Sequence, residues 1–90
     1  MAGTDGHEGG KSSPLSAVVE AVVKTLVDHP DAVKVSQSVR RGLTVVELST
    51  APGDMGKIIG RQGRTAAALR TLVALTAERH GLRAQLDIRD

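Results

Sequence analysis

The segment from Gly60 to Gly63 joins two stretches whose apolar residues recur at helical spacing. Only Arg61 and Gln62 separate the two glycines, so two helices must meet in a very short turn. Such a turn needs positive φ angles, which cost a residue with a Cβ about 1 to 2 kcal/mol and glycine almost nothing. The sequence therefore predicts two consecutive helices joined by a turn whose ends are both glycine.

A short helix is expected before this turn and a long helix after it. The short helix is predicted to begin at Pro52 and to end at Gly60, which would adopt the left-handed conformation. The long helix is predicted from Arg64 to His80, with Gly81 ending it. The apolar face of the short helix consists of Met55, Ile58 and Ile59, and the buried face of the long helix consists of Ala66, Leu69, Leu72, Val73, Thr76 and Ala77.

The chain begins with a segment that has no apolar anchor. Residues 1–13 are rich in Gly, Ser and charge, so we expect a disordered tail, with the folded domain in residues 14–90. The first helix is predicted to begin at Pro14, with Ser13 as its N-cap, and to end at Asp28. Its apolar stripe consists of Leu15, Val18, Val19, Val22, Val23, Leu26 and Val27.

Three further segments alternate apolar and polar residues, as half-buried strands do. They are residues 33–40, 43–49 and 82–89. Val39 is expected on the apolar face of the first strand, which Gln37 interrupts, and the turn at residues 40–42 is short enough for an antiparallel hairpin. The two-helix segment is long enough for a crossover to a parallel last strand. We therefore predict an α+β fold of order α-β-β-α-α-β, with a three-stranded mixed sheet covered on one face by three helices.

Composition limits the core and the chemistry. With 40% hydrophobic residues and no Phe, Trp or Tyr, the core must consist of Val, Leu, Ile, Ala and Met. The chain has no cysteine, so it has no disulfide, no thiolate chemistry and no zinc site that needs sulfur. We expect a soluble, cytoplasmic protein, because no segment resembles a signal peptide or a membrane span. The net charge is only +2, but eight arginines favour an anionic partner if they cluster.

The glycine turn provides such a cluster. Small residues allow a phosphodiester backbone to approach the start of the long helix, where the helix dipole also favours negative charge. Lys57, Arg61 and Arg64 add three cations within eight residues. The spacing alone is equally compatible with a glycine corner between helices that carries ordinary solvated arginines.

The string from Met55 to Arg64, Met-Gly-Lys-Ile-Ile-Gly-Arg-Gln-Gly-Arg, resembles the signature of KH domains, in which Ile-Ile-Gly-x-x-Gly opens a helix. The predicted order of elements agrees with a type II KH domain. Residues 14–90 are similar to the small bacterial KhpA family. This resemblance implies a single-stranded RNA-binding protein that is not an enzyme. It also implies an RNA chaperone that acts with a second, KhpB-like KH protein or as a homodimer and is linked to cell shape and the cell wall.

The resemblance also implies a set of RNA-binding residues. They are Ile58, Ile59, Gly60, Arg61, Gln62, Gly63, Ala66 and Leu69, to which the cation cluster adds Lys57 and Arg64. The glycine turn would contact the backbone of about four nucleotides, over an apolar floor made of either isoleucine with Ala66 and Leu69. Many KH signatures have a large aliphatic residue at the place of Ala66, so this floor would be wider or weaker. Arg79 and Arg83 either extend the positive path or are ordinary surface charges.

Other functions find less support in the sequence. The glycines match neither a nucleotide-binding P-loop nor a dinucleotide fingerprint, and we expect no cofactor and no small-molecule substrate. His7, His29 and His80 lack carboxylates at metal-ligand spacing. Asp54 is expected in the first turn of the short helix, where its charge would favour the dipole. The main alternative is a KH-like protein-interaction module, because the small residues Ala67, Thr71 and Ala74 would let another helix approach the long helix; single-stranded DNA also remains open as a ligand.

Overall fold

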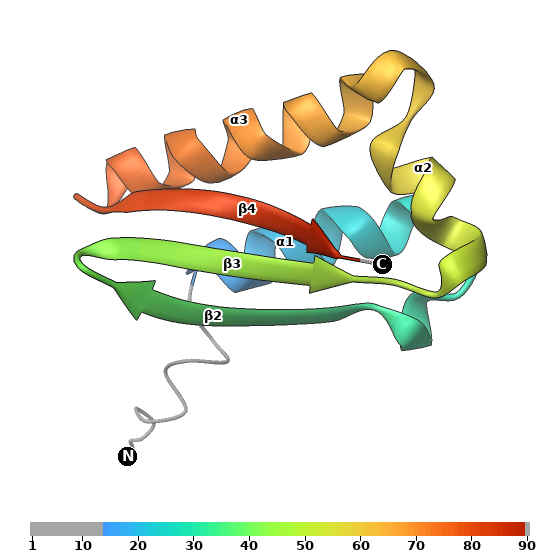
Figure 1. Ribbon diagram of the computed structural model, residues 1–90, viewed down its shortest axis with the longest axis horizontal. Coiled ribbons are helices and arrows are strands. Elements are labelled where there is room, and N and C mark those ends of the chain that lie inside the picture. The colour runs from blue at the N-terminus through green and yellow to red at the C-terminus, as the bar shows by residue number, and fades with distance from the viewer. Residues whose placement is uncertain (1–13, 90) are drawn as a thin grey trace.

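The computed structural model describes residues 14–89, which form one sheet with helices on one side of it (Figure 1). The elements are α1 (Pro14–Leu26), β2 (Lys34–Arg40), β3 (Leu43–Ser49), α2 (Met55–Ile59), α3 (Arg64–Arg79) and β4 (Arg83–Arg89). Short 3-10 turns occupy Pro30–Ala32, Pro52–Asp54 and Arg61–Gly63. The predicted order is confirmed. The tail predicted for residues 1–13 and the cap predicted at Ser13 lie outside the described residues.

The sheet is mixed, as predicted. Its strand order is β2-β3-β4, with β2 antiparallel to β3 and β3 parallel to β4. Arg40 pairs with Leu43 across a two-residue turn, in which Arg41 and Gly42 have φ angles of 53° and 80°. Positive φ at both central residues is typical of a type I′ turn, whose twist suits a hairpin. The helix pair α2–α3 forms the crossover that allows β4 to run parallel to β3.

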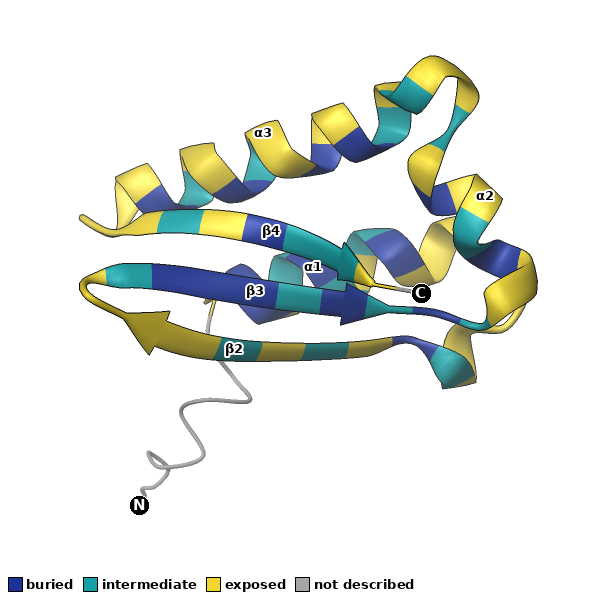
Figure 2. Ribbon diagram, in the orientation of Figure 1, coloured by how far each residue is buried: buried dark blue, intermediate teal, exposed yellow. Residues whose placement is uncertain are grey.

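The core lies between the sheet and the helices (Figure 2). It contains aliphatic side chains from every helix, from β3 and β4, and from Val33 just before β2, as a chain without aromatic rings requires: Leu15, Val19, Val23, Val33, Val46, Leu48, Ile58, Leu69, Val73, Ala77 and Leu86. Each buried Val or Leu contributes about 1.5 to 3 kcal/mol relative to exposure. These contacts hold α1 in place although valine is a poor helix former.

The first strand differs in part from its prediction. Gln37 lies on the core side as an exception to the apolar pattern, and it accepts a hydrogen bond of 3.0 Å from the hydroxyl of Ser16 in α1. A polar group on this side is therefore satisfied by a polar group of the covering helix. The expectation that Val39 is half buried is wrong, because its exposed fraction is 65%. Val39 lies next to the hairpin turn.

The other face of the sheet carries polar and charged side chains from all three strands. Residues that pair across strands share a face, so the register assigns Ser36, Glu47 and Asp87 to this open face, together with Arg40 and Arg83 at the hairpin end. Figure 1 shows α1 on the far side of the sheet from the viewer. Among the described residues, no helix is long and apolar enough to cross a membrane.

Candidate nucleic-acid interface

The glycine loop, defined as Gly60 to Gly63, projects from the molecule at the start of α3 (Figure 1). Gly60 has φ 75° and ψ 173°, and Gly63 has φ 73° and ψ 13°. The prediction of positive φ at both glycines is confirmed. The left-handed conformation predicted for Gly60 is wrong in ψ, because this residue has the extended ψ of a region that is almost restricted to glycine.

The two glycines meet different surroundings. A Cβ added at Gly60 would lie against the side-chain oxygen of Thr65 and 2.7 Å from its Cβ, whereas a Cβ at Gly63 would meet nothing within 4 Å. Gly60 is therefore required by both its backbone conformation and its packing. Gly63 is required by its backbone conformation alone.

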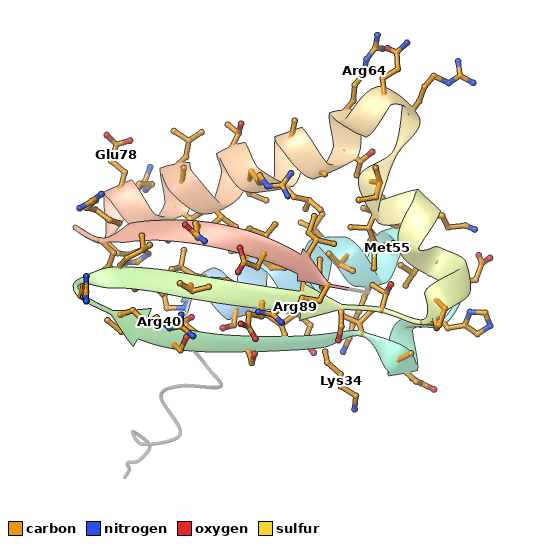
Figure 3. All side chains as sticks on the ribbon, in the orientation of Figure 1. Lys34, Arg40, Met55, Arg64, Glu78 and Arg89 are labelled. Carbon is orange, nitrogen blue, oxygen red and sulfur yellow. The ribbon has the colours of Figure 1, made fainter. Side chains whose placement is uncertain are left out.

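A third residue in the loop has a positive φ. Gln62 has φ 57° and ψ 25°, which is uncommon for a residue with a side chain. Its side-chain oxygen accepts a hydrogen bond of 3.0 Å from Nη2 of Arg64, an arrangement that the sequence did not predict. Strained backbone of this kind clusters at functional sites. In Figure 3 the side chain of Arg64 points away from the body of the protein.

The loop uses some of its own main-chain donors. The N–H of Gly63 donates to the carbonyl oxygen of Gly60 at 3.1 Å, and the main-chain N–H of Arg64 donates to the carbonyl oxygen of Arg61. These two N–H groups are not available to a ligand, so side chains must supply more of the contact than expected. Arg61 is exposed and has no ion pair or hydrogen-bond partner among the described residues.

Lys57 lies in α2, before the loop, and its charge is shared. Its Nζ lies 3.2 Å from Oδ2 of Asp28, and both side chains are largely exposed. An exposed pair of this kind is worth at most about 1 kcal/mol, so an incoming phosphate can compete for the lysine. Of the three cations predicted at the site, Arg61 is unpaired, Arg64 binds an amide and Lys57 binds a carboxylate.

The start of α2 is anchored by Asp54. This residue lies in the 3-10 turn Pro52–Asp54 directly before α2, in line with its predicted place in the first turn, but the sequence did not predict its burial. Its side chain is 1% exposed and accepts hydrogen bonds from the main-chain N–H groups of Asp28 at 3.2 Å and His29 at 2.9 Å. Nδ1 of the His29 ring lies 3.2 Å from Oδ2 of Asp54. Burial raises the pKa of this carboxyl, but the hydrogen bonds and the charge of a protonated His29 outweigh burial and hold the pKa below its usual value. The carboxylate thus ties the chain after α1 to the helix that precedes the loop.

The apolar residues predicted for the floor are not all open to a ligand. Ile58 is 0% exposed, and Ala66 and Leu69 are 3% exposed each, so all three form part of the core beneath the loop. Ile59 is 38% exposed. The structure therefore leaves Ile59 as the member of this set with substantial free surface.

A cleft of about 340 Å³ lies between α3 and the edge of β4, and the sequence prediction missed most of its residues. It is lined by Arg70, Ala84, Gln85, Leu86 and Asp87. Nε2 of Gln85 donates to Oδ1 of Asp87 at 3.1 Å, so the lining of the cleft combines a hydrogen-bonded amide and carboxylate with Arg70. The alternation of β4 could have indicated Gln85 and Asp87, but only the crossover places them near Arg70.

A second cleft, also about 340 Å³, lies on the other side of α3. It is lined by Val22, Leu26, Arg64, Thr65, Ala68, Leu69 and Leu72 and is mainly apolar. The small residues Ala67, Thr71 and Ala74 are exposed on α3, as predicted. Within residues 14–89, no group of three or more His, Asp or Glu side chains could hold a metal ion.

Comparison with known proteins matches nearly the whole of the described chain, including the glycine loop. The sequence model of the KH domain of KhpA and KhpB matches residues 16–88. The RNA-binding protein KhpA of Halalkalibacterium halodurans is 47% identical over 76 residues, which cover 84% of this chain and 100% of that protein. Its counterparts in Leifsonia xyli and Streptomyces coelicolor are 48% and 49% identical, cover 84% and 80% of this chain, and match over 97% and 90% of their own lengths.

A solved structure supports the fold. A variant of Aquifex aeolicus Era bound to GDP and aluminium fluoride superposes with a TM-score of 0.60 over 82% of this chain at 15% identity. The matched region is 29% of that longer protein. At this level of identity the likeness concerns the arrangement of helices and strands only.

Proposed function

The chain belongs to the KhpA/KhpB KH-domain family, and on that premise we propose that it binds single-stranded RNA through the glycine loop. Residues 14–90 would be the binding domain, acting in the cytoplasm and without catalytic activity. The relatives named above are described as RNA-binding proteins, which supports RNA as the ligand.

One observation carries this proposal. The loop holds Arg61, an exposed arginine without a partner in the described chain, between two glycines of positive φ at the start of a 16-residue helix. The glycines keep the approach free of side chains, and the helix dipole favours an anion there. Arg61, Arg64 and Lys57 are the cations we assign to the RNA backbone, with Ile59 contacting a base. Ile58, Ala66 and Leu69 would support the loop from the core.

The test changes Arg61 and Gln62 together to Asp. This double substitution moves the loop by three charges toward negative, and both side chains are exposed, so the fold should persist. We expect binding of a short single-stranded RNA to be lost, measured by fluorescence anisotropy, with an unchanged circular dichroism spectrum. Neutralising three or four phosphates predicts a log-log salt slope of about −2 to −3 for the parent.

The matched control is Lys34→Asp with Ser36→Asp, which makes the same charge change on the exposed edge strand β2. It should reduce affinity only slightly, through the net charge of the protein. If the loop variant folds and still binds RNA as tightly as the parent, the loop is not the site.

We also propose that the protein acts as an RNA chaperone together with a second KH protein. Weak contacts to about four nucleotides gain effective affinity when two modules are joined. The family is named for KhpA and KhpB together, which supports such a pairing, and the apolar cleft between α1 and α3 offers a surface for it. A link to cell shape and the cell wall rests on the family resemblance and would be tested by deleting the gene and inspecting cell morphology.

The same cleft favours the second candidate function, a module whose main partner is another protein. Ala68 lines the cleft, so Ala68→Glu should weaken a homodimer or a complex with a KhpB-like protein, as measured by sedimentation equilibrium. Ser36→Glu on the open sheet face is the control. If the parent binds a protein partner but no RNA at low salt, the interaction module becomes the better description.

A further inference from the structure

A second group of arginines lies at the hairpin end of the sheet. In the register, Leu43 pairs with Arg40 on one side and with Arg83 on the other. Paired residues share a face, so the two arginines flank Leu43 on the open face of the sheet. Neighbouring strands are about 4.8 Å apart, which separates their Cα atoms by about 10 Å. The fold therefore brings together two cations that are 43 positions apart in the sequence.

The hairpin turn adds a third arginine where turn geometry does not favour one. Arg41 has φ 53° and precedes Gly42, which has φ 80°. A type I′ turn prefers Asn, Asp or Gly at its first central position, because those residues tolerate positive φ. Arg41 is exposed and makes no described contact that would explain its presence. A residue that breaks a local rule without a structural gain suggests a functional role.

These arginines are not neutralised within the described part of the chain. On the same open face, Nη2 of Arg89 lies 3.0 Å from Oε2 of Glu47. Among the described residues, no carboxylate forms an ion pair with Arg40, Arg41 or Arg83. The carboxylates of this face are Glu47 and Asp87. They are opposite each other in the register of β3 and β4 and lie toward the other end of these strands. Glu78 lies in the last turn of α3, and its side chain points away from the sheet (Figure 3).

The chain places one more cation at this end. Arg79 ends α3, and the short turn at residues 80–82 leads from it directly to Arg83 at the start of β4. We call Arg40, Arg41, Arg79 and Arg83 the hairpin-end arginines; all four are exposed. The 16 residues of α3 separate them from the glycine loop by about 24 Å along the helix.

We propose that the hairpin-end arginines form a second contact site for the backbone of the same single-stranded RNA, beyond the nucleotides held by the glycine loop. This inference rests on the proposed RNA binding and extends it. Arginine suits this ligand, because its guanidinium binds phosphate and also stacks on unpaired bases. Val39 and Leu82 are 65% and 47% exposed at the same end, so they offer apolar surface to unstacked bases in a chain without aromatic rings. An RNA that reaches both sites must be longer than about four nucleotides.

The test combines two RNA lengths with the variant Arg41→Asn/Arg83→Gln. Asparagine suits the first position of a type I′ turn, so the melting temperature of this variant should equal or exceed that of the parent. The parent should bind an RNA of about fifteen nucleotides more tightly, and with a steeper salt slope, than one of about five. The variant should bind the longer RNA about tenfold more weakly, with a salt slope smaller by about 1.4, because two phosphate contacts are lost. Its affinity for the shorter RNA should not change.

The matched control is Lys24→Gln/Lys34→Gln, which removes the same net charge from exposed positions on α1 and β2. It should leave the preference for the longer RNA intact. If the Arg41/Arg83 variant binds the longer RNA with the affinity and salt slope of the parent, or if the control loses as much, the second site is refuted while binding at the glycine loop stands. If the parent binds neither RNA, both proposals fail.

Discussion

The glycine loop and the hairpin turn share one backbone feature in different surroundings. Gln62 and Arg41 are the non-glycine residues with positive φ in the described chain, and each is followed by a glycine of positive φ. At the loop, Thr65 packs close to Gly60, and Asp54 ties the preceding helix to the rest of the domain. At the hairpin, a Cβ on Gly42 would meet nothing within 4 Å.

The difference shows how the same local backbone conformation can be stabilised in different ways. The loop is held by the packing of Thr65 against Gly60 and by the anchored helix before it, so its conformation is part of the architecture. The hairpin turn is held by strand pairing alone, and its arginines are free of partners within residues 14–89. A substitution at Gly60 should therefore affect stability and binding together, whereas replacing an exposed side chain, such as Arg61 at the loop or Arg41 at the hairpin, should affect binding with little loss of stability.

The largest effect is expected from Gly60→Ala. The new Cβ would adopt a conformation that costs about 1 to 3 kcal/mol and would also collide with Thr65, so we expect the free energy of unfolding to fall by about 3 kcal/mol or more. Gly63→Ala and Gly42→Ala add a Cβ in open space at positive φ and should each cost about 1 to 2 kcal/mol. Urea denaturation of the three variants measures the difference. Equal losses for all three would show that the packing around Gly60 relaxes and that the two turns are equivalent.

A smaller effect, which depends on pH, is expected from Asp54→Asn. The pKa of Asp54 is lower in the folded chain than its usual value, so the ionised carboxylate stabilises the fold above that usual value. This contribution should disappear as the pH falls through the lowered pKa. The melting temperature of the variant should therefore lie below that of the parent at pH 6. The difference between the two melting temperatures should narrow toward pH 3, because the carboxylate of the parent begins to be protonated below about pH 4.

Glu47→Gln is the control for Asp54→Asn. It removes the partner of Arg89 from an exposed pair worth at most about 1 kcal/mol. Its melting temperature should stay close to that of the parent over the same pH range. If the melting temperature of Asp54→Asn lies below that of the parent by the same amount at every pH, the charge of Asp54 does not stabilise the fold. Its contribution would then come only from its shape and from hydrogen bonds that do not need the charge.

The smallest effect is expected from Asp28→Asn. This change removes the carboxylate that pairs with Lys57 at 3.2 Å and leaves that lysine free for phosphate. Affinity for the short RNA should rise about two- to fivefold at low salt, in line with an exposed pair worth below about 1 kcal/mol. The removal of Asp31, an exposed carboxylate with no described cation partner, is the control. An unchanged affinity for Asp28→Asn would place Lys57 outside the RNA contact.

Local pattern was enough to predict the order of elements and most of the core. Alternation predicted strands at 33–40, 43–49 and 82–89, which the structure has at 34–40, 43–49 and 83–89, and helical spacing identified the buried face of α3. These predictions succeeded because burying one face of a helix or a strand requires a periodic apolar pattern. The positive φ of Gly60 and Gly63 was also predictable, because so short a turn between two helices allows few other residues.

Tertiary structure decided which polar residues meet. Asp54 lies 25 residues from His29 in the sequence, so nothing local indicated that it would be buried against the main chain there. Likewise, Arg40 and Arg83 share a face only because the crossover lays β4 parallel to β3 in one register. Periodicity describes each segment separately, whereas contacts between distant polar groups depend on how the segments pack. The sequence by itself therefore determined the elements and the glycine turn, and the packing of those elements determined the anchor at Asp54 and the grouping of arginines at the hairpin end.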